Sequence, residues 1–366
     1  MEVKIQSRVI QVVALGILGC MALSPALWGF GDRSIVPLLP LVGQAKQGGG
    51  EIWVGLPAIA GLIAVLIFPN RKWILAGTSL LLLIYCLLDL NRLQPWLWFG
   101  LLMFTGQVTG VGLKGSLWVI AGMYCWSGFN KINPHFVSGN FPWFCDAFEA
   151  TKEFGLQHWM GYSLAVLEMI LGLGMLSAKT RKLAAPSLIA MHVLIVIFLM
   201  KLQWNFVVIP WNVSLAVMLA LIIKHNSESA QLKHLHWKMA PAIALAWLCP
   251  IIYFFHCWPY NLSWQLYSNT QAEATFYVQD PSKIENQHLK ELWPEVAFGE
   301  GTKLFLDDLS TKYLLVPMFV SDRTCKQYGE YLCRIAGTDQ EYKGLFLLSV
   351  DQWVLDSDRL EDIPCK

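Results

Sequence analysis

A succession of apolar segments fills most of the chain and constrains its fold more than any other feature. A helix needs about 20 mostly apolar residues to cross the hydrocarbon core of a bilayer. We expect membrane helices at residues 9–29, 52–69, 73–90, 96–111, 114–130, 159–177, 183–200, 206–223 and 239–257. Only 14% of the residues are charged, against about 25% in an average soluble domain. The sequence therefore predicts a polytopic membrane protein of about nine helices. The first segment lacks a clear cleavage site, so we interpret it as a helix rather than a signal peptide.

The last hundred or so residues depart from this apolar pattern. The stretches "ATFYVQD" and "YKGLFLLSVDQW" are rich in β-branched and aromatic residues, which favours strands. Between them, "SDRTCKQYGEYLCRIAG" predicts a helix that Ser321 and Asp322 can cap and that Gly337 can end. We therefore predict an all-α membrane helical bundle over residues 1–257, followed by a small α+β soluble domain over residues 258–366.

The distribution of Lys and Arg between the loops predicts an orientation. Basic residues are in excess in cytoplasmic loops. They are more frequent at the N-terminus and in the loops on its side than in the opposite loops, which hold Arg33, Lys46, Arg92, Lys131, Lys152 and Lys201. We expect a cytoplasmic N-terminus and an exoplasmic tail, in what is most simply a bacterial inner membrane. The net charge of +1 gives no indication of nucleic-acid binding.

Two cysteines of the predicted tail helix bear on its disulfide chemistry. Cys325 and Cys333 are eight residues apart, which is about 12 Å along a helix axis. That separation is too long for a bond between them. In an exoplasmic tail Cys365 or Cys257 is the better partner, and free buried thiols are the alternative.

Ionisable residues inside apolar segments usually face the interior of a bundle. Glu168 lies near the middle of one segment and His192 inside the next. Each is either a functional group or a structural hydrogen-bonding partner between helices. Asp89 and Arg92 are three residues apart, so they can form a local ion pair at the membrane interface. No second His or Cys lies at metal-binding spacing, so we predict no metal site.

The stretch "KLQWNFVVIPWNVSL" combines indoles and amides at the start of an apolar segment. Pro210 interrupts the helical hydrogen bonds there. Trp204, Asn205, Trp211 and Asn212 suit a flat aromatic ligand with polar edges, such as a quinone. The alternative is an interfacial aromatic belt, which explains the tryptophans but not the deeper Asn212.

The stretch "YCWSGFNKINPHF" puts Lys131 at the end of an apolar segment, among small and amide residues. A lysine there can extend its ammonium group to the interface. Its neighbours favour another interpretation, because Gly128 permits close helix contact, Asn130 and Asn133 supply amides, and Pro134 ends the helix. A lysine held at such a closely packed helix end can lose its proton and act as a base in its neutral form.

At this motif the chain resembles the vitamin K-dependent gamma-carboxylase family and its bacterial HTTM-domain relatives. A helix of that family ends in a pattern like A-G-x-x-K-[LI]-[DN]-x-x-[WF]-x-x-G. The stretch "SGFNKINPHFVSG" is similar at Gly128, Lys131, Ile132, Asn133, Phe136 and Gly139. The family's lysine is regarded as the base that deprotonates vitamin K hydroquinone, so the resemblance implies that role for Lys131. The layout is also similar, with an acidic residue in the next helix, here Glu168, and a histidine in the one after, here His192.

The resemblance also has departures. The carboxylase has a catalytic histidine after its third span, whereas "DLNRLQPWLW" contains none. A tail of about a hundred residues stands in place of its large lumenal region. The tail piece "VPMFVSDRTCKQYGEYLC" looks like a pattern in uncharacterised bacterial HTTM-type proteins. What the resemblance implies is therefore activation of a quinol, or another chemistry on the same scaffold.

Two functions follow as hypotheses. In the first, the chain is a membrane enzyme in which Lys131, Glu168 and His192 are catalytic. Asn130, Asn133, Trp204, Asn205, Trp211 and Asn212 then bind a vitamin K-like quinol that modifies an exoplasmic peptide or lipid. In the second, the helices contact lipid, anchor the tail and bind another membrane protein in export, immunity or maturation of a secreted peptide.

Overall fold

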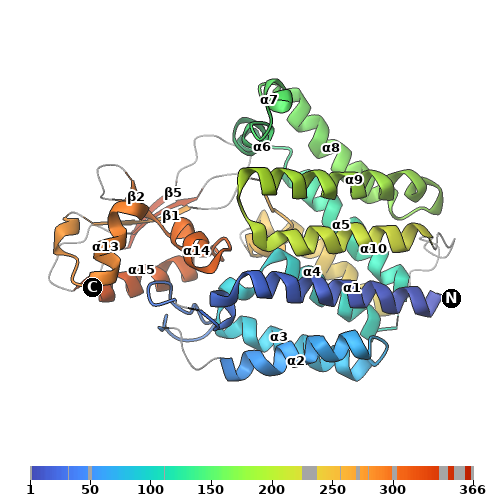
Figure 1. Ribbon diagram of the computed structural model, residues 1–366, viewed down its shortest axis with the longest axis horizontal. Coiled ribbons are helices and arrows are strands. Elements are labelled where there is room, and N and C mark those ends of the chain that lie inside the picture. Colours follow the sequence, from blue (N-terminus) through green and yellow to red (C-terminus); the bar gives the residue numbers. More distant parts are fainter. Residues whose placement is uncertain are drawn as a thin grey trace. The chain divides into compact units, whose positions relative to one another are not determined.

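The computed structural model describes residues 2–31, 33–47, 52–110, 112–224, 237–255, 257–268, 273–278, 280–298, 303–337, 345–349 and 359–363 (Figure 1). The chain divides into two compact units. The helical unit comprises Met1–Leu23, Leu56–Leu83 and Gln94–Asn269, and the tail unit comprises Ser24–Gly55, Ile84–Leu93 and Thr270–Lys366. This grouping differs from a simple division at residue 257, because two segments between helices pack with the tail.

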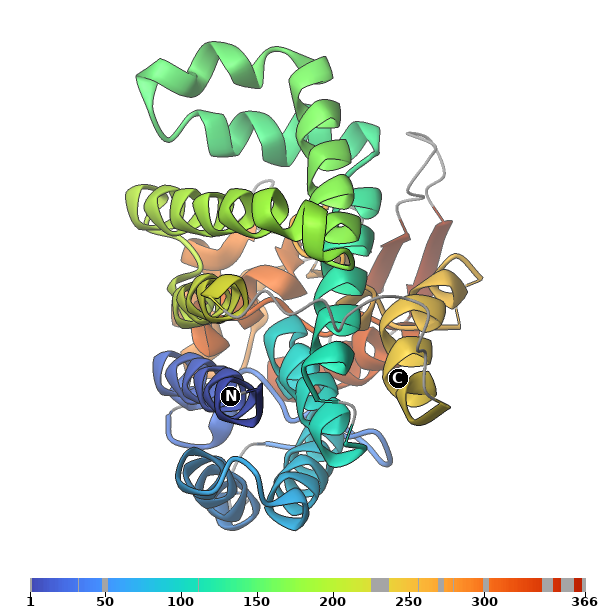
Figure 2. The same ribbon diagram turned by 90° about the vertical axis from the view of Figure 1, so that its right-hand side faces the viewer.

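Helices occupy all nine ranges that the apolar pattern predicts. They are α1 (Glu2–Leu23), α2 (Ile52–Ile67), α3 (Lys72–Leu88), α4 (Pro95–Val108), α5 (Gly112–Asn130), α8 (His158–Gly174), α9 (Ala178–Leu202), α10 (Ile209–Lys224) and the consecutive turns α11 (Ala240–Ile243), Ala244–Leu248 and α12 (Cys249–Tyr253). Two short helices, α6 (Phe141–Cys145) and α7 (Glu149–Gly155), connect α5 to α8. In the helical unit α1, α10 and α9 run side by side, and Figure 2 shows α1 and α10 nearly end-on.

Three of the described helices are long and apolar enough to cross a membrane. They span Val3–Leu23, Ala178–Leu202 and Phe206–Lys224, and shorter apolar helices span Gly55–Ile67, Lys72–Leu88 and Ala240–Tyr253. The protein is thus mostly helical and of a kind that associates with membranes. The larger number of nine membrane-crossing helices stays a prediction.

The helix α8 has an apolar exterior and a small, polar interior face. Its buried residues are Gly161, Ala165, Glu168 and Gly172, which recur at intervals of three or four. They share one face of the helix, because three to four residues make one turn. Large apolar side chains such as Ile170, which is 54% exposed, lie on the outer face. This distribution suits a helix with lipid on one side and close helix packing on the other.

The tail unit is α+β, as the sequence predicts. Its strands form an antiparallel sheet in the order β2-β3-β1-β4-β5. Their bounds are β1 (Glu273–Tyr277), β2 (Ala297–Phe298), β3 (Lys303–Phe305), β4 (Leu345–Ser349) and β5 (Arg359–Ile363), with helices α13 (Gln287–Val296), α14 (Leu306–Leu314) and α15 (Asp322–Ala336). The predicted tail helix is confirmed: Ser321 and Thr324 form a capping box at its start, and Gly337 follows its end.

A buried charge cluster lies inside the tail unit. Asp89 Oδ2 lies 2.8 Å from Arg33 Nη1 and 4.0 Å from Arg92 Nε, and all three side chains are at most 4% exposed. Arg92 also donates to the Leu27 carbonyl and lies over the Tyr85 ring. The predicted Asp89–Arg92 pair therefore exists, and both side chains are buried in protein rather than extended toward solvent. Arg33, which lies 56 residues before Asp89, is the closer partner.

The cysteines of the tail test part of the predicted disulfide chemistry. Cys333 takes part in a disulfide, Cys325 is not its partner, and Cys257 is a free thiol. The separation argument is thus confirmed, the choice of Cys257 is wrong, and Cys365 lies outside the described residues. Disulfides persist in oxidising compartments, so the bond agrees with the predicted orientation.

Candidate functional site

Lys131 is the first residue after α5, and its side chain turns back along the helix. Its Nζ lies 3.0 Å from Glu168 Oε2 on α8, and it donates to Ser127 Oγ at 2.6 Å and to the Ser127 carbonyl at 3.3 Å. The side chains of Lys131 and Glu168 are only 11% and 9% exposed. The ammonium group therefore does not extend toward an interface, and it forms a buried ion pair between α5 and α8.

Two glycines explain why the ion pair forms. A Cβ added at Gly128 would lie 2.5 Å from the Ala165 carbonyl oxygen, and one at Gly172 would lie 2.8 Å from the Cys125 nitrogen. Real Cβ atoms do not approach backbone atoms so closely, so only glycine permits this helix separation. The backbones of α5 and α8 thus come close enough for a lysine at the end of one helix to reach a glutamate in the middle of the other.

A network of hydrogen-bonded side chains, the Tyr124–His192–Asn212 network, connects α5, α9 and α10. The Tyr124 hydroxyl lies 2.5 Å from His192 Nε2, and His192 Nδ1 lies 2.8 Å from Asn212 Oδ1. Asn212 Nδ2 donates to the Val208 carbonyl at 2.8 Å. All three side chains are at most 4% exposed. Each buried polar group of this network has a partner, so burying it carries little desolvation penalty. The hydrogen bonds also fix the three side chains relative to one another.

The ion pair and the Tyr124–His192–Asn212 network line the same cavity, which has a volume of about 50 Å³. Its polar lining is Tyr124, Ser127, Lys131, Glu168, His192 and Asn212. Its aromatic lining is Trp211, Trp264 and Tyr267. The Trp211 Nε1 hydrogen is buried and has no acceptor among the described residues. A cavity with both proton acceptors and an unused donor has the lining of a ligand site.

The predicted site residues divide into two groups. Those that line the cavity are Lys131, Glu168, His192, Trp211 and Asn212. The remaining four, Asn130, Asn133, Trp204 and Asn205, do not line it. Their side chains instead hold residues 259–268, a segment of irregular backbone that we call the strap.

Asparagine amides fasten the strap to the helices. Asn130 Nδ2 donates to the Ser263 carbonyl at 2.8 Å, and Asn133 Nδ2 donates to the Ser268 carbonyl at 3.1 Å. Asn205 Nδ2 lies 3.3 Å from the Tyr267 hydroxyl. Burial raises the pKa of Tyr267 above its usual value, so the phenol stays protonated. These amides therefore have a structural role next to the cavity.

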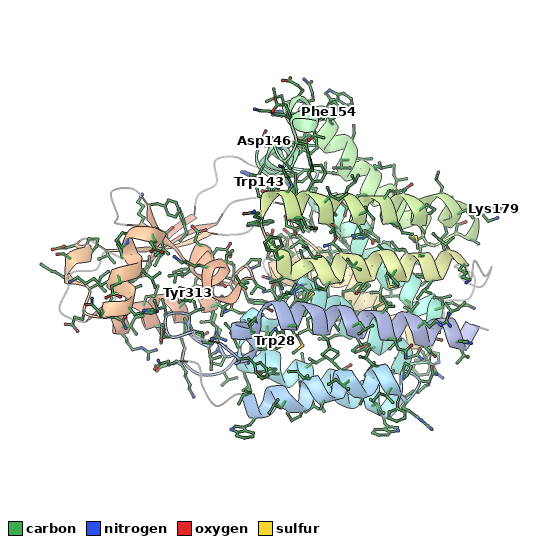
Figure 3. The ribbon with its side chains drawn as sticks, in the orientation of Figure 1. Trp28, Trp143, Asp146, Phe154, Lys179 and Tyr313 are labelled. Carbon is green, nitrogen blue, oxygen red and sulfur yellow. The ribbon has the colours of Figure 1, made fainter. Side chains whose placement is uncertain are left out.

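The strap places aromatic rings over the cavity at a cost in backbone strain. Trp264 and Tyr267 have φ values of 61° and 64°, which non-glycine residues rarely adopt. Tyr267 packs on Trp204, which in turn packs on Trp143 of α6, labelled in Figure 3, with ring centroids 5.5 Å and 4.8 Å apart. Such strain persists only where the surroundings hold it, and it often marks functional segments.

Sequence reasoning missed Tyr124, Ser127, Trp264 and Tyr267. The first two carried a signal, because residues 124 and 127 share one face of α5, and Lys131, directly after the helix, continues that spacing of three and four. The strap residues carried none, because their place follows from backbone turns and contacts more than a hundred residues away in sequence.

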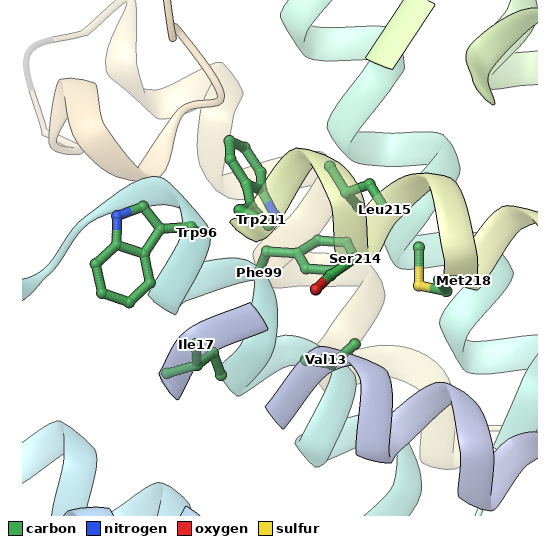
Figure 4. Close-up of a pocket in the computed structure, with 8 residues that line it drawn as sticks. All are labelled: Val13, Ile17, Trp96, Phe99, Trp211, Ser214, Leu215 and Met218. Carbon is green, nitrogen blue, oxygen red and sulfur yellow. The ribbon is translucent and has the colours of Figure 1, made fainter. Parts of the chain in front are cut away.

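Two further observations concern cavities and possible metal sites. A smaller cavity of about 10 Å³ lies between α1, α4 and α10, next to Trp211 and Leu215 (Figure 4). Its lining is largely apolar, with Ser214 as the exception, and it has room for about one water molecule. Within the part of the chain that the structure describes, no three His, Cys, Asp or Glu side chains come together as a metal site.

Comparison with known proteins adds no assignment. No family model matches the chain, and no curated protein or solved structure shows significant similarity to it.

Proposed function

We propose that the helical unit is a membrane enzyme, similar to the vitamin K-dependent gamma-carboxylase and HTTM proteins, in which the Lys131–Glu168 pair removes a proton from a quinol hydroxyl. The observation that carries this proposal is the position of the pair: it lines a cavity that residues of α5, α8, α9, α10 and the strap also line. In the wider proposal nine helices cross a bacterial inner membrane, and the quinol, with molecular oxygen, drives modification of an exoplasmic peptide or lipid.

The two members of the pair have different roles in the proton transfer. An ammonium group has three donors and no lone pair, so Lys131 cannot take a proton while it is charged. Glu168 Oε2 lies 3.0 Å from Lys131 Nζ and can receive one of its protons. The neutral amine then takes the quinol proton, and the ammonium that forms stabilises the quinolate beside it. Glu168 thus stores one proton during the reaction.

The other walls of the cavity support a flat ligand with oxygen atoms at its edge. Trp211, Trp264 and Tyr267 supply aromatic faces, and the Trp211 indole N–H can donate to a quinol oxygen. A cavity of about 50 Å³ is smaller than the roughly 150 Å³ that holds benzene in an engineered protein. Binding therefore requires movement, and the strained strap is the segment that we expect to move.

One observation favours the second hypothesis, a non-catalytic protein that anchors the tail and binds a partner. Lys131 Nζ already has three oxygen partners within 3.3 Å, namely Glu168 Oε2 and two atoms of Ser127. That is a complete set for an ammonium group, as expected for an ion pair that only joins two helices. An experiment must therefore distinguish an ion pair that only joins α5 and α8 from one that also transfers protons.

The double variant Lys131→Met/Glu168→Leu makes that separation. Replacing a whole buried ion pair by apolar side chains is often neutral or stabilising, so the variant should fold. We expect purified wild-type protein in detergent to consume an added naphthoquinol, followed by absorbance, and the double variant to lose at least 99% of that rate, in line with typical losses of acid–base assistance. The control is Lys201→Met, which removes an exposed lysine of α9. Equal rates in wild type and double variant would favour the anchoring hypothesis.

A further inference from the structure

We infer that Tyr124 and His192 form a second proton-accepting path into the same cavity, with Asn212 as its positioning residue. This inference rests on the proposed function, because it gives the second hydroxyl of a quinol an acceptor of its own. Tyr124 then faces the ligand, and Asn212, which the sequence suggested as a ligand contact, acts through His192.

The hydrogen bonds of Asn212 determine the tautomer of His192. Asn212 Nδ2 donates to the Val208 carbonyl, so the amide oxygen is the atom that faces the imidazole. An amide oxygen only accepts, so His192 Nδ1 carries a hydrogen. In a neutral ring Nε2 is then the acceptor, and the Tyr124 hydroxyl 2.5 Å away donates to it. The path is therefore oriented from the tyrosine toward the histidine.

The Tyr124 hydroxyl can pass on a proton that it receives. It donates its own hydrogen to His192, and its oxygen lone pair remains available in a cavity that Tyr124 lines. When a ligand O–H bond breaks, the proton moves to Tyr124 Oη while the Tyr124 O–H proton moves to His192 Nε2. The products are a ligand oxyanion and a His192 imidazolium whose Nδ1–H is held by Asn212. No electrons are transferred in this step.

The charges around the imidazole permit this step. Glu168 and Lys131 are both close enough to His192 to act on it electrostatically, with opposite signs. After both transfers Lys131 is an ammonium beside a protonated Glu168, so the pair carries a charge of +1, and the −2 charge of the ligand dianion offsets this charge and that of the imidazolium. The two paths can therefore each hold one proton from the same ligand.

A purely structural role predicts a different result. A histidine that only joins α5, α9 and α10 stays neutral when a ligand binds. A relay histidine becomes an imidazolium, which infrared difference spectroscopy detects directly. The location of the proton is thus the readout, and it does not depend on completed turnover.

The test uses the full-length protein in detergent and a naphthoquinol as the added probe. We expect an imidazolium band to appear on binding in wild type, to be retained in His158→Gln as the exposed-histidine control, and to disappear in His192→Gln. Tyr124→Phe keeps the ring and removes the hydroxyl, and it should lose at least nine tenths of the band. For positioning, Asn212→Leu should lose the band and Asn212→Asp, which still accepts from Nδ1, should restore it.

The outcomes separate this inference from the proposed function. A wild-type protein without an imidazolium band, but with turnover that needs the Lys131–Glu168 pair, overturns the relay and leaves the proposed function standing. An imidazolium band that needs Tyr124, with turnover unaffected by loss of the pair, supports the relay and overturns the role of Lys131. A full band in Tyr124→Phe overturns the relay, and the wild-type measurement remains valid even if a variant fails to fold.

Discussion

Replacing Gly128 by alanine tests the helix contact on which the site depends. The added Cβ would lie 2.5 Å from the Ala165 carbonyl oxygen and 2.6 Å from the Met169 nitrogen. Both are backbone atoms of α8, so neither can rotate away. Ordinary contact begins at 3.4 Å, and the two helices must therefore separate by about 0.9 Å at this point.

The size of the effect follows from two opposing contributions. Overpacking of a close contact costs about 1–3 kcal/mol. Alanine recovers up to about 1 kcal/mol, because it favours a helix more than glycine does. We expect a net destabilisation of about 1–2 kcal/mol. The same movement would lengthen the Lys131–Glu168 contact from 3.0 Å to about 4 Å, so turnover should fall as well.

Thermal unfolding in detergent measures the destabilisation. A thiol-reactive dye follows the unfolding, because it reports exposure of buried cysteines such as Cys20 and Cys86. The matched control is Gly77→Ala in α3, where the added Cβ meets nothing within 4 Å. Gly77→Ala should therefore unfold at or above the wild-type temperature and keep its turnover. If Gly128→Ala is as stable and as active as Gly77→Ala, the close contact of α5 and α8 does not position the site.

Two further predictions concern the tail unit and the topology. Asp89→Asn removes the buried carboxylate that Arg33 and Arg92 face, so it should destabilise the tail unit by about 3–5 kcal/mol in chemical unfolding. The control is Asp280→Asn, at a half-exposed side chain, where asparagine can still accept from Ser282, and it should change stability far less. With Cys257 replaced by serine, an impermeant thiol reagent added to intact cells should label Glu291→Cys and not Lys182→Cys, and the opposite pattern would reverse the topology.

Local patterns in the sequence were enough to find the helices and part of the site. Helix positions could be read from residue type alone, because lipid and helix interiors select apolar side chains over a continuous stretch. Lys131, Glu168 and His192 stood out because ionisable residues are rare in such stretches, and all three line one cavity. The tail helix was found from its local cap at Ser321.

The contacts that the sequence did not predict join residues distant in sequence. Asn130 and Asn133 have the chemistry of ligand-binding amides, but their acceptors are carbonyls of the strap, 133 and 135 residues away. Asp89 and Arg92 have suitable spacing for a pair, yet Arg33 is the closer partner of Asp89. A spacing rule describes only neighbours on one element, so partners from other elements could not be predicted.

Turnover of the Lys131→Arg variant tests the central claim most directly. Arginine keeps the positive charge and can still pair with Glu168, so the helices should remain joined and the unfolding temperature should stay near that of wild type. Guanidinium does not lose its proton in proteins, so it cannot act as the base. We predict that naphthoquinol consumption falls by about 10²–10⁴-fold, with Lys201→Arg as the unaffected control. A folded Lys131→Arg protein with wild-type turnover would contradict the assignment of Lys131 as the base.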